Sequence, residues 1–160
     1  MHAEPQNEHR WLQKMVGKWT AEYECSMGPD QPPVKNKGFE VVRSLGGLWV
    51  LAEGEGESPD GQPHRSLMSI GFDPQKNKFV GTFVSSMMTF LWVYEGSLDA
   101  SAGKLTLDTQ GPDFSGGGKL VPYQDIIEFK SDDHRTLTSF VLTKEGTWQH
   151  IVTAHYHRES

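Results

Sequence analysis

Three ionisable side chains interrupt apolar strand faces: Arg43, Glu53 and His150. Arg43 continues the alternating face of Phe39 and Val41, and His150 stands between two apolar positions of its own strand. Both are therefore predicted to point into the core, whereas Glu53 points in or out depending on the parity of its strand. A polar group buried without a partner costs about 1–3 kcal/mol, so each of the three predicts a ligand or an internal partner.

Two chemistries are open to this group. A guanidinium binds a carboxylate through two parallel hydrogen bonds, so Arg43 is a candidate anchor for the anionic head group of a ligand. The alternatives are an internal pair between Arg43 and Glu53, or an arginine at the mouth of a cavity with its head in water. If Glu53 and His150 converge in one pocket, they form a candidate acid and base for an enzyme.

The histidines raise the question of metals and haem. His155 and His157 share a strand face, but a catalytic zinc normally has three protein ligands and the sequence provides no third beside them. No metal site is predicted. No cofactor is predicted either, although haem held by His150, or by His155, stays an alternative to a hydrogen-bonded core histidine.

Composition argues against several partners. The 160 residues carry a formal net charge of -6, and no cluster of lysine and arginine offsets it, so binding of nucleic acid is not predicted. No apolar run approaches the roughly 20 residues of a membrane-spanning helix. The single cysteine, Cys25, cannot form an internal disulfide, and residues 1–10 lack the features of a signal peptide. We therefore expect a cytoplasmic protein.

The elements that must position these side chains are mostly strands. Aromatic residues make up 11% of the chain, beside 17 glycines and 9 prolines, which is typical of strands joined by tight turns. Helical spacing is confined to residues 8–16, with Asn7 as the expected N-cap and Gly17 as the expected end of the helix. A proline-rich loop is expected over 27–36. We predict ten strands, at residues 18–25, 37–45, 48–57, 64–73, 78–86, 89–99, 103–110, 119–130, 134–144 and 146–157.

The connections between these strands are short, which favours an antiparallel meander over a parallel sheet. Ten such strands would coil and close into an all-β, up-and-down barrel, with the N-terminal helix across one end. One domain spanning residues 1–160 is expected.

The interior of such a barrel is either filled by side chains or open to a ligand. The residues predicted to line it, besides the polar candidates above, are aromatic or methionine: Met68, Phe83, Met87, Phe90, Trp92, Tyr94, Tyr123 and Phe140. The stretch SSMMTF (85–90) favours a cavity, because methionine adapts to varied guests. If side chains fill the barrel, its outer surface would carry the function. Exposure of Trp11 or Trp49 would then favour an interaction module or a homodimer.

Several stretches resemble a known family. The residues GKW at 17–19 resemble the G-x-W opening of calycin barrels, the superfamily of lipocalins and fatty-acid-binding proteins. Four longer stretches resemble successive hairpins of a bacterial domain-of-unknown-function family with calycin-like barrels: LGGLWVLAEGEGE (45–57), IGFDPQKNKFVGTFVSSM (70–87), YEGSLDASAGKLTL (94–107) and YQDIIEFKSDDHRTL (123–137). The resemblance implies the fold and a central cavity but no catalytic residues. It also implies that Gly17 and Trp19 help to close the barrel, with Arg158 from the last strand packed against the indole.

The leading hypothesis is thus a binding protein for a small, largely apolar or amphipathic ligand, with Arg43 holding an anionic head group. An enzyme, a haem-binding barrel and a filled barrel acting as an interaction module are the alternatives.

Overall fold

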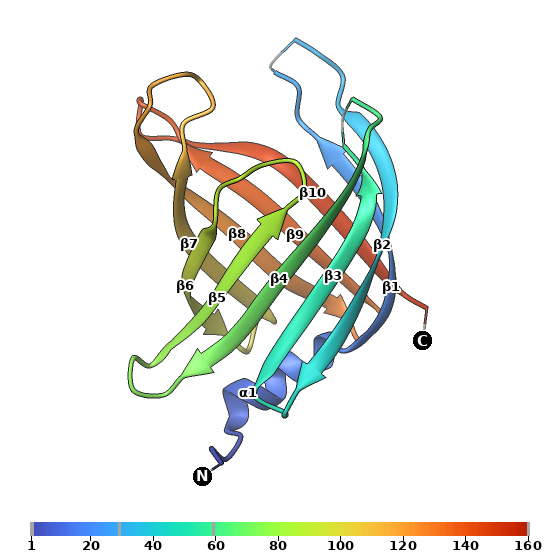
Figure 1. The fold of residues 1–160 in the computed structure, drawn as a ribbon, viewed down its shortest axis with the longest axis vertical. Coiled ribbons are helices and arrows are strands. Elements are labelled where there is room, and N and C mark those ends of the chain that lie inside the picture. The colour runs from blue at the N-terminus through green and yellow to red at the C-terminus, as the bar shows by residue number, and fades with distance from the viewer. Residues whose placement is uncertain (1, 29, 59, 160) are drawn as a thin grey trace.

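The computed structural model describes residues 2–28, 30–58 and 60–159. In these residues ten strands close into a barrel, in which each strand pairs antiparallel with its sequence neighbours and the first pairs with the last (Figure 1). The strands are β1 (Gly17–Cys25), β2 (Val34–Leu45), β3 (Trp49–Glu57), β4 (Pro63–Asp73), β5 (Lys78–Ser85), β6 (Trp92–Asp99), β7 (Lys104–Pro112), β8 (Leu120–Ser131), β9 (His134–Leu142) and β10 (Trp148–Arg158). The predicted all-β, up-and-down barrel is confirmed.

The N-terminal helix α1 (Asn7–Leu12) runs into a 3-10 turn, η1 (Gln13–Met15), and lies across one end of the barrel (Figure 1). Its N-cap is Gln6, one residue earlier than predicted, because the backbone N–H of Gln6 donates to Nδ1 of His9 at 2.9 Å. With Nδ1 accepting, Nε2 of the same ring donates to the carbonyl of Phe72 at 3.0 Å and ties α1 to β4. Nowhere in the described part of the chain is a helix long and apolar enough to cross a membrane.

Two strand boundaries differ from the prediction by three residues, and the others agree to within two. β2 begins at Val34, inside the expected loop, because Val34 pairs with Cys25 and extends the ladder to β1. Pro33 stands just before the strand, where its missing N–H interrupts no ladder. β6 begins at Trp92, three residues later than expected.

The half of the barrel beneath α1 is filled. Side chains from the helical segment and from seven strands are almost completely buried there: Leu12, Met15, Trp19, Val42, Val50, Ile70, Phe79, Leu105, Leu107 and Ile127. The Nε1–H of Trp19 donates to the carbonyl of Met15 at 2.9 Å, so even its polar atom is used within the core. We call this part of the interior the closed half.

Candidate functional site

The end of the barrel away from the helix is not filled. Side chains that the strand register turns inward keep partial exposure there, so solvent reaches the inner wall. They come from six strands: Tyr23, Cys25, His64, Ser66, Phe83, Asp125, Ser139, Val141 and Val152. We call this part of the interior the open half.

The apolar wall of the open half is built by β4 to β8. The register places Phe83 between Met68 on β4 and Trp92 on β6. Tyr123 packs edge-on against Trp92, with ring centroids 4.9 Å apart. The indole lies against Gly111, where a Cβ atom would come within 1.9 Å of the ring. These four lining residues therefore face inward, the orientation that their alternation predicts.

A carboxylate stands in this wall. Asp125 on β8 accepts a hydrogen bond on each oxygen, from the hydroxyl of Tyr94 at 2.5 Å and from that of Ser139 at 2.6 Å. Burial raises the pKa of the Asp125 carboxyl, and the two hydroxyls partly offset that rise. Burial, and then the adjacent carboxylate, raise the pKa of Tyr94 well above its usual value, so the phenol keeps its proton and acts as the donor.

Sequence reasoning missed Asp125, although a signal for it was available. Asp125 lies two residues beyond Tyr123 and so shares its inward parity. A single acidic residue on an otherwise apolar face is the same kind of pattern that drew attention to Arg43.

A buried ion pair lies between the two halves. The guanidinium of Arg135 pairs with the carboxylate of Glu40 and lies over two rings, 4.6 Å from the centroid of Trp19 and 4.1 Å from that of Tyr156. Arg135 is 1% exposed, and its Nε–H has no hydrogen-bond partner among the described residues. Burial, with the nearby Glu40, raises the pKa of Tyr23 to about 12.

The predicted inward orientation of Arg43 is wrong. The inner face of β2 carries the even-numbered residues, among them Glu40 and Val42, whereas Phe39 is half-exposed on the outside. Arg43 and Glu53 do form an ion pair, but they form it on the outer surface, with side chains 58% and 45% exposed. Phe39 and Val41 are apolar but lie on the outer face of β2, so their alternation with polar residues indicated the wrong face as buried. The ion pair links β2 and β3 on the outer surface.

His150 also points outward, and a β-bulge is the reason. The pairing of β10 with β9 shifts between His150 and Val152, which inverts the parity of the residues before the bulge. Phe140, opposite His150, also lies on the outer face, because β9 turns its odd-numbered residues inward. The imidazole contacts the hydroxyl of Ser26 through Nδ1 at 2.5 Å and that of Thr153 through Nε2 at 2.7 Å. Because His150 and Glu53 lie on separate strands outside the barrel, the predicted acid–base pair is not formed.

The remaining lining candidates lie in the connection between β5 and β6. Met87 is exposed, so its predicted inward position is wrong, and Phe90 is half-buried against Trp92 with ring centroids 5.1 Å apart. Of the two tryptophans considered for an outer interface, Trp11 is buried, whereas Trp49 is partly exposed on the outer wall.

The histidines of β10 gain a neighbour that the sequence pattern did not indicate. The register places His134 of β9 opposite His157, with ring centroids 4.5 Å apart, and His155 lies 5.4 Å away on the other side. All three rings stack on the outer surface, and Nε2 of His134 lies 3.1 Å from Nδ1 of His155, within hydrogen-bond distance. No group of three or more histidine, cysteine, aspartate or glutamate residues that could hold a metal ion is found among residues 2–28, 30–58 and 60–159.

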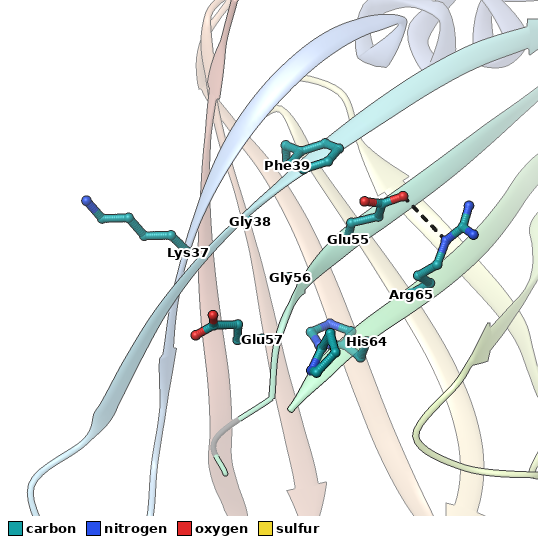
Figure 2. Close-up of a pocket in the computed structure, with 9 residues that line it drawn as sticks. Lys37, Gly38, Phe39, Glu55, Gly56, Glu57, His64 and Arg65 are labelled. Carbon is teal, nitrogen blue, oxygen red and sulfur yellow. Dashed lines mark ion pairs between the residues drawn. The ribbon is translucent and has the colours of Figure 1, made fainter. Parts of the chain in front are cut away.

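A pocket of about 550 Å³ lies where β2, β3 and β4 approach the open end (Figure 2). Its side chains come mainly from the outer face, including Lys37, Phe39 and an exposed ion pair in which Nε of Arg65 is 3.4 Å from a carboxylate oxygen of Glu55. The inner face contributes His64 and two glycines. Charges that remain in water discriminate weakly between ligands, so the open half is the better candidate site.

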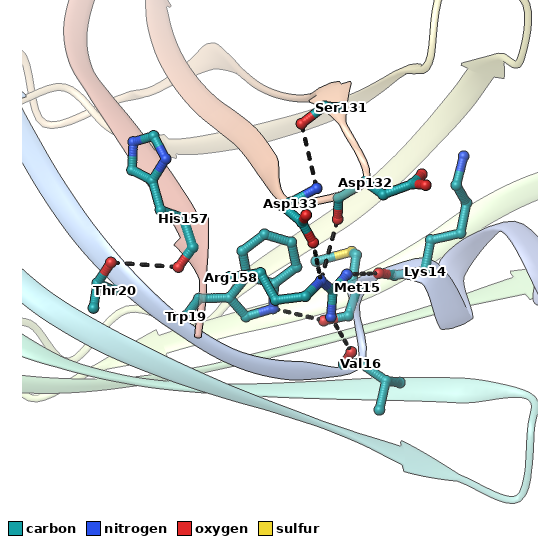
Figure 3. A network of polar contacts seen from close by, with 10 residues as sticks. All are labelled: Lys14, Met15, Val16, Trp19, Thr20, Ser131, Asp132, Asp133, His157 and Arg158. Carbon is teal, nitrogen blue, oxygen red and sulfur yellow. Dashed lines mark hydrogen bonds and ion pairs between the residues drawn. The ribbon is translucent and has the colours of Figure 1, made fainter. Parts of the chain in front are cut away.

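The closed end is held by Arg158 (Figure 3). Its guanidinium lies 4.2 Å from the ring centroid of Trp19 and donates to the carbonyls of Val16 and Lys14, each at 2.7 Å. Gly17, between helix and strand, has a φ of 143°, a conformation that favours glycine. The last strand is thereby tied to the junction of η1 and β1, and the arginine occupies the place that the family resemblance implied.

Solved structures share this fold. Rv2717c from M. tuberculosis superposes with a TM-score of 0.63 at 13% identity, covering 98% of this chain and all (100%) of that one. The S-type phycobiliprotein lyase CPES from Guillardia theta gives 0.61 at 13% identity, covering 98% and 99%. EF1p2_mFAP2b bound to DFHBI gives 0.51 at 12% identity, covering 96% and 100%. At these identities the likeness establishes the fold alone.

The curated proteins include no match to the chain. Over residues 4–158, however, the chain matches a family described as proteins of unknown function, DUF1579, and it belongs to that family.

Proposed function

We propose that the protein binds a small, largely apolar molecule in the open half of its barrel. The observation that carries the proposal is a contrast within one interior: most of the fully buried apolar side chains lie in the closed half, whereas inward apolar side chains such as Phe83, Val141 and Val152 stay partly exposed in the open half. Apolar surface left exposed on a concave wall is typical of a ligand site. A barrel that functioned only through its outer surface would not need a partly exposed apolar inner wall.

Two of the similar barrels support the idea. CPES is named as a phycobiliprotein lyase, and EF1p2_mFAP2b was solved with DFHBI bound. The anionic head group expected from Arg43 is not part of the proposal, since Arg43 lies outside the barrel.

The test is to fill the open half. Val141 points inward on β9, and its neighbour Leu142 points outward with a similar intermediate burial. Nile red, a neutral apolar dye, should bind the wild-type protein and the Leu142→Trp control, and should bind Val141→Trp at least about tenfold more weakly because the indole takes its space. Native mass spectrometry of the purified wild-type protein should also reveal any molecule that it retains.

Equal Nile red affinity in the two variants would place the dye outside the barrel and overturn the proposal. So would a wild-type protein that carries no retained molecule and binds no Nile red.

A further inference from the structure

One carboxyl group at the open half has no ion-pair partner. The carboxyl and guanidinium groups on the inner wall that the described residues provide are those of Glu40, Arg135 and Asp125. Asp113 lies at the rim near Tyr123, with Lys144 nearby. Glu40 and Arg135 neutralise each other, and Arg135 is fixed between two aromatic rings with 1% exposure, so it cannot turn to meet a ligand. Asp125 has no ion-pair partner within the described chain. Asp125 is therefore a carboxyl group of the inner wall that no cationic side chain of the described residues neutralises.

The two hydrogen bonds that Asp125 accepts leave it with capacity for a further donor. The hydroxyls of Tyr94 and Ser139 occupy one acceptor position on each oxygen and fix the carboxylate in place. A carboxylate has about four acceptor positions, so about two are left. Both present donors are neutral, so they orient the charge without cancelling it. Asp125 keeps partial exposure as a residue, on a strand face that points inward.

Aromatic rings adjoin this carboxylate. Tyr94 donates to it directly, and Tyr123, two residues along β8, packs against Trp92. Aromatic faces attract cations as well as apolar groups. The combination is one carboxyl group, two orienting hydroxyls and an aromatic wall, and none of the described lysine or arginine side chains pairs with that carboxyl group.

We propose that Asp125 is the polar anchor of the open half and selects apolar ligands that carry a cationic, N–H-donating nitrogen such as a protonated amine. The inference rests on the proposed function, and it reverses the head-group charge expected from the sequence. A carboxylate-bearing ligand would face Asp125 across a partly desolvated wall and be repelled, whereas an ammonium would gain a charge-assisted hydrogen bond.

Three naphthalene probes of similar size test the selection at neutral pH. They are a cationic amine (1-naphthylmethylamine), a neutral alcohol (1-naphthylmethanol) and a carboxylate, the anion of 1-naphthaleneacetic acid (1-naphthylacetate). By calorimetry, the amine should bind wild-type protein at least about tenfold more tightly than the acetate, with the alcohol between them. Asp125→Asn should abolish the preference for the amine and leave the affinity for the alcohol within about twofold. Glu128→Gln, an acidic residue of the same strand that points outward and pairs with Lys130, is the control and should change none of the three.

The possible failures are distinct. If neither Nile red nor any of the three naphthalene probes binds, the proposed function itself is wrong. If the alcohol binds and Val141→Trp blocks it, but wild-type protein prefers the acetate or does not discriminate, binding stands and the role of Asp125 is refuted. That comparison uses wild-type protein alone, so it decides the matter even if Asp125→Asn does not fold.

Discussion

The two halves of the barrel use their polar groups differently. In the closed half these groups form hydrogen bonds with the backbone. Trp19 donates to the carbonyl of Met15, His9 to that of Phe72, and Arg158 to the two carbonyls of Lys14 and Val16 just before β1. In the open half the hydroxyl of Tyr123 also donates to backbone, at Pro112, but Asp125 accepts from two side chains and has acceptor positions left over. If the open half binds the ligand as proposed, stability is concentrated at one end of the barrel and binding at the other, so mutations should separate the two properties.

The largest effect is expected from Trp19→Ala in the closed half. The indole is 0% exposed and lies beneath Arg158, so its loss should lower the free energy of unfolding by about 3–5 kcal/mol. Nile red affinity should change by less than about twofold. Urea unfolding and dye titration measure the two quantities. Trp148→Ala, at a 43% exposed tryptophan, is the control and should cost less than about 1 kcal/mol. An unchanged unfolding midpoint for Trp19→Ala would show that the closed half is not the stable core.

A slightly smaller loss is expected at the boundary between the halves. Glu40→Gln leaves the guanidinium of Arg135 buried without its counter-charge, which should destabilise the fold by about 3 kcal/mol. The same change at Glu55, whose pairing with Arg65 is exposed, should stay within about 0.5 kcal/mol. Equal effects of the two substitutions in urea unfolding would mean that the ion pair is not buried.

A pH dependence should mark the open half. Because the folded-state pKa of Asp125 lies above its ordinary value of 3.8, the folded protein holds this proton more tightly than the unfolded chain does. Stability should therefore fall as pH rises from 3.8 to the folded-state pKa and should level off above it. Unfolding free energies of wild-type protein and Asp125→Asn, compared across about pH 3–7, isolate this contribution. A difference that changes in the opposite direction would contradict the burial of the carboxyl.

The smallest effect is expected outside the barrel. Arg43→Ala removes one member of an exposed ion pair and should change stability by no more than about 1 kcal/mol. The affinity for 1-naphthylacetate should not change at all. A clear loss of acetate binding would restore Arg43 as an anchor for an anionic group.

How much the sequence could predict depended on the regularity of each strand. On β4, β5 and β6, large apolar residues such as Met68, Phe83 and Trp92 recur on one face, and they face inward as their alternation predicts. On β2, Phe39 and Val41 lie on the outer face, so apolar character pointed the wrong way. On β10, the bulge between His150 and Val152 shifts the register by one residue, and the residues around it do not predict a bulge.

The ion pair shows a second kind of limit. Glu40 and Arg135 are 95 residues apart in sequence, and only closure of the barrel brings them together. Each looks like a surface charge within its own strand. Asp125, by contrast, could have been found from parity alone.

A crystal structure of the protein with Nile red bound would test most directly the claim that the open half is the binding site. The expected result is dye density in the open half, in contact with Met68, Phe83 and Trp92, with the closed half unchanged. Dye in the outer pocket beside Phe39 and Arg65, or an open half filled by its own side chains, would contradict the claim.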